Sequence, residues 1–471
     1  MSGLFTTLHS SVKALNAHSR AIETAGKNLA NVNNTSYARQ RVVYGDRGTV
    51  QTPDGAQSLG LEALGVQQLR DQLLDRQLMR EVSLLASFEA EQAAYERAEA
   101  SLGQNIDRTN KTTSSGSNAS TGGMAAALND FFNAFQSLAS RPTDSGERQT
   151  LLQKAQILVD RFVQTDARLA QVQTDLDAKI EQDVGTANTL LTTIADLNSQ
   201  IGRIEIGNPG TAIDLRDQRQ AKLEELAKLL PVEVRNSTDG QVQVVLKDAA
   251  NADIVLVDRA DVTGAVSFTG SGLTAGSPAT AVSFSSGSIY GSLNARDGGV
   301  QALRTSLDQL ASQLVTAVNA AYNPSATAGA DFFTATGTAA GTISLRSGLT
   351  AAGISAGTGA AGDNSIALAV AAVASQQFST ASGDSIDGTL SGHFATAVST
   401  LGQSLASAQS RAEDQENIKN LVLNRRDTVS GVSLDEEMAD LVRFQRAFQA
   451  SSRVFSIVDD LLDTVVNGLG R

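Results

Sequence analysis

Residues that could carry chemistry are few and scattered in this chain of 471 residues. The three histidines, His9, His18 and His393, form no metal-binding spacing, and with no cysteine in the chain, thiolate metal sites and cysteine nucleophiles are excluded. The turns GDNS (362–365) and GDSIDG (383–388) place carboxylates beside glycine and could indicate Ca²⁺, but ordinary turn chemistry explains them better. We therefore expect no metal and no cofactor.

One short stretch matches two functional patterns by letter, one catalytic and one for nucleotide binding. GISAGTGAAG (353–362) contains the GxSxG of a nucleophile elbow around Ser355, and also GxGxxG. Asp363 or Asp384 and then His393 follow in the order of a hydrolase triad. No strong strand precedes the stretch, and its surroundings are rich in Ala and Gly, where such matches arise by chance. The sequence therefore predicts no enzyme.

Charged residues also cluster in IDLRDQRQ (213–220), which holds Asp214, Arg216, Asp217 and Arg219. A catalytic carboxylate pair would be one interpretation of this cluster. We favour the other, a salt-bridged junction between domains.

Composition limits the partners and the compartment. The formal net charge of −13 argues against nucleic acid or an anionic membrane as the main partner. No apolar run reaches the length of a membrane span, and the first residues lack the apolar core of a cleaved signal peptide. Taken alone, these features indicate a soluble, cytoplasmic protein.

The elements at the two ends look complementary. Apolar residues recur every seven positions at both ends, at Leu8, Leu15, Ile22 and Leu29 and at Leu434, Leu441, Phe448, Phe455, Leu462 and Leu469. Residues 1–48 carry a net charge of +4 and residues 434–471 one of −3. We expect the two ends to pair as a coiled coil that is marginal in a monomer and firm when neighbours bury it. Two separate amphipathic helices on a globular core remain the alternative.

Between the ends the pattern is helical, with one change of period. Apolar spacing predicts helices over 69–102, 124–139, 145–204, 293–322 and 394–428. After Pro231 the period becomes two, which predicts an inserted β-domain over 231–290. The predicted fold is mainly α with this inserted β-domain and nested domains. Its parts are an N-terminal helix and amide-rich motif (1–45), a helical bundle in two parts (46–230 and 291–429, with a poorly placed segment 324–395) and a C-terminal helix (430–471).

The first helix ends in NLANVNNTSYARQ (28–40), an unusual cluster of side-chain amides. In that position it resembles the N-terminal motif of bacterial flagellar axial proteins, the rod, hook and hook-associated proteins. SGVSLDEEMADLVRFQRAFQASSRVFSIVDDLLDTVVN (430–467) resembles their C-terminal motif. Internal stretches are most similar to the hook-associated protein 1 family, among them DQLLDRQLMRE (71–81), ALNDFFNAFQSLASRPTDSGERQTLL (127–152) and YGSLNARD (290–297).

Two departures from the family pattern fall in the amide-rich motif. The chain has Asn34 where the family usually has Thr, and Ser36 where it usually has Gly. Because Asn tolerates left-handed backbone, we expect Asn34 to take over the bend that Gly would otherwise make.

The resemblance implies a structural role without catalysis. It implies a homo-oligomer that polymerises at the distal hook end as an adaptor between hook and filament, with hook protein, the second hook-associated junction protein, an export chaperone and the type III export apparatus as partners. It also moves the expected location outside the cell, to the flagellum. The heptad residues above would form the assembly interface together with Asn28, Asn31, Asn33 and Tyr37. A hook or distal rod protein, or a secreted enzyme on flagellar-type ends, remain alternatives.

Overall fold

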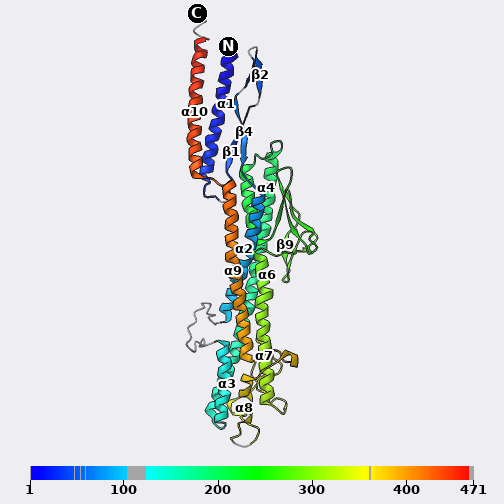
Figure 1. Cartoon of the computed structure of the whole chain (residues 1–471). Helices are drawn as coiled ribbons and strands as arrows, with labels where there is room; N and C mark the ends of the chain where they lie inside the picture. The colour runs from blue at the N-terminus through cyan, green and yellow to red at the C-terminus, as the bar shows by residue number, and fades with distance from the viewer. Residues whose placement is uncertain are drawn as a thin grey trace. The chain divides into compact units, whose positions relative to one another are not determined.

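The computed structural model describes residues 2–34, 36–46, 48–52, 55–58, 60–102, 123–359 and 362–465 (Figure 1). The chain divides into two compact units. The first unit comprises residues 1–85, 184–287 and 415–471, and the second comprises 86–183 and 288–414. Each unit is therefore built from segments far apart in the sequence.

The terminal helices and two two-stranded antiparallel sheets form one part of the first unit. The long helices are α1 (Ser2–Ala30) and α10 (Leu434–Asp463). Between α1 and the next helix lie four strands, β1 (Gln40–Asp46), β2 (Thr49–Thr52), β3 (Gly55–Ser58) and β4 (Leu61–Gln68). β1 pairs antiparallel with β4, with a bulge between Val43 and Tyr44, and β2 pairs with β3.

The rest of the first unit combines helices with the predicted β-domain. It contains the first residues of α2 (Gln72–Leu102), the last residues of α4 (Ser145–Glu205) and of α9 (Leu390–Ser430), and all of α5 (Ile213–Leu229). One antiparallel sheet joins β5 (Glu233–Asn236), β6 (Val242–Lys247), β7 (Asp253–Asp258) and β8 (Asp261–Val262) in that order. A second, smaller sheet has the order β11 (Thr280–Ala281), β10 (Leu273–Ala275), β9 (Val266–Phe268).

The second unit is helical around one hydrophobic core. Its helices are α3 (Met124–Ser140), α6 (Ser288–Ala295), α7 (Gln301–Tyr322), α8 (Ser365–Ala372) and the remaining parts of α2, α4 and α9. A π-helical turn, Arg296–Val300, joins α6 to α7. A side chain caps the start of α4, where Asp144 Oδ1 accepts from Gly146 N at 2.7 Å.

The segment 324–395, which showed no clear period in the sequence, is held to this core by an aromatic cluster. Phe332 and Phe333 are fully buried and pack edge-on against one another, with ring centroids 5.2 Å apart. The Asn319 side chain accepts from the backbone N of both residues and donates to Phe333 O. Short 3₁₀ turns at Ala351–Gly353, Val373–Ser375 and Thr380–Ser382 complete the segment.

The predicted fold class, mainly α with an inserted β-domain, is confirmed. The sequence analysis assigned residues 46–230 to a helical bundle with its first helix over 69–102 and placed no strand before that helix, whereas the structure has strands β1 to β4 between Gln40 and Gln68. Strands β1 to β4 come first because Val42, Val43 and Tyr44 favour extended backbone, and Gly55 has a φ of +115° where the β2–β3 hairpin turns. Over the described ranges, no helix is long and apolar enough to cross a membrane.

Candidate functional site

The two terminal helices lie side by side and run antiparallel, as Figure 1 shows. The side of α10 that is most covered follows a 3.5-residue repeat. Leu462 and Val458 are buried, and Leu441 and Phe455 are half-buried. The spacing of these four residues is that of a coiled-coil seam. The predicted pairing of the termini is therefore present within one chain.

The covered side of α1 consists of small residues. α1 contacts α10 and also β1 and β4, and its most buried residues include Ala17, Ala21 and Ala25. Small side chains allow neighbouring backbones to approach closely. The predicted heptad residues lie beside this face and are half-buried: Leu8, Leu15, Ile22 and Leu29.

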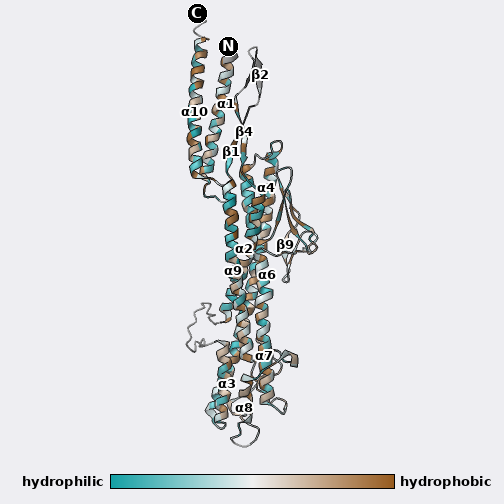
Figure 2. Cartoon of the chain, viewed as in Figure 1, coloured by the Kyte–Doolittle hydropathy of each residue, from teal (hydrophilic) through white to brown (hydrophobic). Residues whose placement is uncertain are grey.

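Several apolar residues of α10 stay exposed. Of the predicted interface residues, Leu434 is 51% exposed and Phe448 is 37% exposed, and Leu469 lies outside the described residues. Figure 2 shows hydrophobic and hydrophilic residues interspersed along the helix. The other exposed apolar side chains are Met438, Val442, Val454, Ile457 and Leu461. Such a run on one helix is typical of a surface that another chain covers.

Asn28, the first amide of the motif at the end of α1, is buried and fully hydrogen-bonded. It is 1% exposed and makes four hydrogen bonds. Its Oδ1 accepts from Gln40 N (3.0 Å) and from the Tyr37 hydroxyl (2.8 Å). Its Nδ2 donates to Gln40 O (2.8 Å) and to Glu437 Oε2 (3.0 Å). One side chain thus ties the end of α1 to the start of β1 and the start of α10.

The other amides act locally. Asn31 Nδ2 donates to Lys27 O at 2.9 Å and so caps a carbonyl of α1. Asn34 Oδ1 accepts from Ser36 N at 3.2 Å, an Asx turn. Asn33 is exposed. The expected left-handed bend at Asn34 is absent. Among the described non-glycine residues, φ is positive at Asn251 and two others, and it is not positive at Asn34.

Arg39 carries the charge attraction between the termini. Its guanidinium lies 2.6 Å from Glu437, 2.7 Å from Glu436 and 3.7 Å from Asp440. Within the described ranges, every ion pair between residues 1–48 and α10 comes from this arginine. The opposite charges predicted from the sequence therefore meet at one point beside β1, and do not run along the helix pair.

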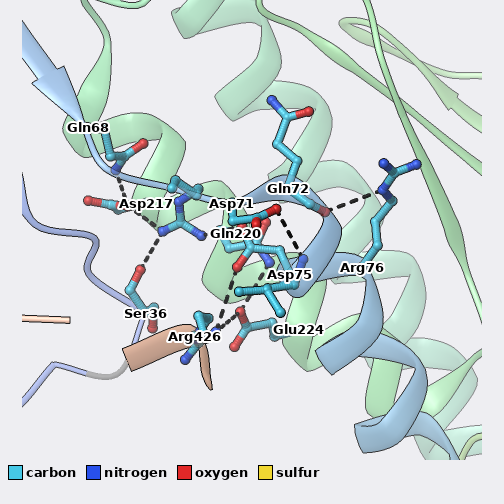
Figure 3. A network of polar contacts seen from close by, with 12 residues as sticks. Ser36, Gln68, Asp71, Gln72, Asp75, Arg76, Asp217, Gln220, Glu224 and Arg426 are labelled. Atoms are coloured by element: carbon cyan, nitrogen blue, oxygen red, sulfur yellow. Dashed lines mark hydrogen bonds and ion pairs between the residues drawn. The ribbon is translucent and has the colours of Figure 1, made fainter. Parts of the chain in front are cut away.

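A second polar network continues from this point (Figure 3). Arg70 pairs with Asp217 at 2.6 Å and with Asp75 at 3.0 Å, and donates to Ser36 O at 2.7 Å. Arg426 of α9 donates to Glu224 of α5 at 2.8 Å. We call the two networks together the polar joint: Asn28, Tyr37, Arg39, Gln40, Arg70, Asp75, Asp217, Glu224, Arg426 and Glu437.

The charged side chains of IDLRDQRQ form salt bridges and hydrogen bonds inside the first unit, so a junction between domains stays a prediction. Asp214 accepts from Gln40 Nε2 at 3.3 Å, and Arg216 pairs with Glu205 at 2.6 Å. Burial, together with the nearby carboxylates of Asp217, Asp214 and Glu437, raises the pKa of the Tyr37 hydroxyl, so this group remains a donor.

The joint makes the stability of the first unit depend on pH through Asp217. Burial raises its pKa from 3.8 to about 6, although Arg70 and Gln68 act in the opposite direction. A folded-state pKa above the unfolded one contributes stability at low pH that is lost as the pH rises through 6. Between pH 5 and 7 we expect the ionisation of Asp217 to lower the free energy of unfolding by about 1 kcal/mol.

Urea unfolding of wild type and D217N at both pH values tests this, since the variant should lose that dependence. D253N is the matched control: Asp253 is exposed and its pKa is lowered to about 2 by hydrogen bonds from Arg235 and Lys247, so it does not titrate in this range. An unchanged pH dependence in D217N would contradict the raised pKa.

The residues of the predicted catalytic alternative are not assembled. Ser355 N donates to the Tyr322 hydroxyl, whereas His393 Nε2 lies 2.9 Å from the Ser306 hydroxyl. Asp363 accepts from Thr358 N and Ser365 N within its own loop, and Asp384 accepts from Gln313 and from Ser379 N. In the part of the chain that the structure describes, no group of three or more possible ligands could hold a metal ion.

Comparisons with known proteins agree with the resemblance seen in the sequence. A family model, "Flagellar hook-associated protein FlgK helical domain", matches residues 110–333, and "Flagellar basal body rod FlgEFG protein C-terminal" matches 427–469. Flagellar hook-associated protein 1 of Bacillus subtilis is 27% identical over 100% of this chain and 99% of its own length. The Salmonella typhimurium protein of that name is 24% identical over 98% and 99%, and that of Escherichia coli is 26% identical over 69% and 59%.

Among solved structures, the flagellar hook junction protein FlgK from Burkholderia pseudomallei aligns with a TM-score of 0.45 and 21% identity, over 55% of this chain and 46% of that one. The matches to the helical domain and to the C-terminal helix identify a structural component of the bacterial flagellum. Within that class, the comparisons agree on one family, that of flagellar hook-associated protein 1, to which this chain is similar along nearly its whole length.

Proposed function

We propose that this protein polymerises at the distal end of the flagellar hook and forms the adaptor between hook and filament. The name of its relatives supports a hook-associated role. The observation that carries the mechanism is the terminal helix pair. One face of the pair is packed within the chain, while half-buried leucines on α1 and exposed apolar residues on α10 remain for neighbours to cover.

The mechanism is geometric. The polar joint fixes where α10 starts relative to α1 and β1, so every copy would present the same apolar surface. Contacts between unlike surfaces of neighbouring copies can then repeat around a ring and leave a free surface for the next protein. Hook protein would cover one side, and the second hook-associated junction protein the other.

We further propose that the chain has no enzymatic activity and is exported through the flagellar type III apparatus with the help of a chaperone. The absence of catalysis is supported by the Ser355 and His393 contacts: each residue is hydrogen-bonded to a different partner, Tyr322 and Ser306, and they do not form a catalytic pair. A hook or distal rod protein is disfavoured because residues 110–333 match the helical domain of the hook-associated family.

Addition of the purified protein to isolated hooks, followed by electron microscopy, tests the proposal. We expect a short, self-limiting cap at one end of each hook. Unlimited growth would indicate a hook or rod protein instead. Failure of a folded protein, verified by circular dichroism, to bind either end would contradict the junction role.

A further inference from the structure

A cavity of about 190 Å³ in the first unit is lined by four arginines. Its walls come from the end of β4 and the start of α2, from α5, and from the turn between β5 and β6. The arginines are Arg70, Arg76, Arg216 and Arg219. Four guanidinium groups in one cavity repel one another unless acidic groups neutralise them, so the partners of each arginine decide whether the cavity is positively charged.

Two of the four arginines are neutralised within the chain. Arg70 is paired with Asp75 and Asp217 in the polar joint. Arg216 makes a bidentate salt bridge with Glu205: Nε lies 2.8 Å from Oε1 and Nη2 lies 2.6 Å from Oε2. Neither of these groups needs a ligand.

Arg219 is different, because it is buried and has only neutral partners. It is 6% exposed, and its Nη1 donates to Asn198 Oδ1 (2.7 Å) and to Gly240 O (2.9 Å). No carboxylate of the described residues lies within ion-pair distance of it. Burial and the neighbouring Arg216 and Arg70 lower the pKa of Arg219 to about 10, although the Glu205 carboxylate, which is paired with Arg216, acts in the opposite direction, so Arg219 stays charged at neutral pH.

Arg76 supplies a second guanidinium at the rim. It is exposed, its Nε donates to Gln72 O at 3.3 Å, and among the described residues it too has no carboxylate partner. The Nε and Nη2 of Arg219 have no acceptor in the described part of the chain, and these two atoms form the edge of a guanidinium that receives an oxyanion with two parallel hydrogen bonds. Leaving a buried cation without a counter-charge is costly.

We propose that this cavity binds one oxyanion, a carboxylate or a phosphate group, between Arg219 and Arg76. Two sources share this chemistry: a free inorganic anion, and an acidic side chain of a second copy of the chain. The second source depends on the proposed polymerisation, whereas oxyanion binding itself does not.

Thermal unfolding in sodium phosphate and in sodium acetate, each against sodium chloride at equal ionic strength, measures binding. We expect a saturable rise in the unfolding temperature, and R219Q should weaken the phosphate affinity at least tenfold. R203Q is the matched control: Arg203 is exposed in the last turn of α4 and does not line the cavity, so it should keep the wild-type response. The comparison also removes the general stabilisation that phosphate gives any protein.

A second pair of variants keeps the test decisive should R219Q not fold. Thr238 is exposed in the turn that lines the cavity. T238E should weaken phosphate binding at least fivefold by placing a carboxylate at the rim, whereas T238Q should not. Equal responses in wild type, R219Q and T238E, or no saturable response in wild type, would overturn the proposal.

The source of the oxyanion is then read from assembly on hooks. Loss of capping by folded R219Q, with acetate bound by wild type, would assign the site to an acidic side chain of a neighbouring copy. Capping by R219Q equal to wild type would assign it to a free anion. Failure of wild type itself to cap hooks would count against the proposed function alone, since oxyanion binding is measured on the isolated chain.

Discussion

Removal of residues 434–471 will abolish addition to hook ends while the second unit remains folded. The deleted segment contains α10, and with it the partner of α1 and of Arg39. The core of the second unit draws on none of these residues, because its buried cluster lies within residues 94–408. Electron microscopy should therefore show bare hooks, and circular dichroism should show a cooperative helical transition that persists in the truncated chain.

Two adjacent leucines separate pairing within the chain from contact between chains. Leu462 is 8% exposed and faces into the chain, whereas its neighbour Leu461 is 48% exposed. L462D should destabilise the first unit by about 3 kcal/mol, because it buries a charge where an apolar side chain packed. L461D should leave unfolding unchanged and still reduce capping. Normal capping by L461D, or by the truncated chain, would contradict an interface made by α10.

The long helices were predictable because their period is carried by many residues. The helix predicted over 145–204 is α4, Ser145–Glu205, and the one predicted over 394–428 is α9, Leu390–Ser430. Pro142 and Asp144 mark the boundary before α4 in the sequence itself. The alternation after Pro231 likewise located the β-domain.

The strands β1 to β4 were missed because their pattern is short and irregular. The bulge between Val43 and Tyr44 shifts the register, so side chains do not alternate cleanly along β1. The signal that could have found them was the β-branched and aromatic run Val42, Val43, Tyr44, followed by Gly55 and Gly60 at the turns, both with positive φ.

The polar joint could be located only in part from the sequence. The amide-rich motif was recognised as the end of α1, but the partners of Asn28 lie 9, 12 and 409 residues away. No local pattern specifies such partners, because they depend on how the helices and strands pack. The same holds for Arg219. That it has no ion-pair partner can be recognised only from the folded structure, in which the nearby carboxylates are paired with other arginines.

Replacement of Asn28 by alanine should destabilise the first unit by about 3–5 kcal/mol, as measured by urea unfolding. The substitution removes four hydrogen bonds and leaves the Gln40 N–H and carbonyl and the Tyr37 hydroxyl without their partner in a buried place. N28D keeps the size of the side chain but turns a donor into an acceptor that faces Gln40 O and the Glu437 carboxylate. N28D should lower the free energy of unfolding at least as much as N28A does. That result would show that hydrogen bonding and charge at this position matter more than side-chain volume.

Asn33 provides the matched control from the same motif. It is exposed, and N33A should change the free energy of unfolding by less than about 0.5 kcal/mol. Under the proposed assembly role, N33A would lower capping of hooks without lowering stability, whereas N28A would lower both. An N28A protein as stable as N33A would show that α1, β1 and α10 are positioned by their apolar contacts alone, and the polar joint would lose its proposed role in fixing the geometry of each copy.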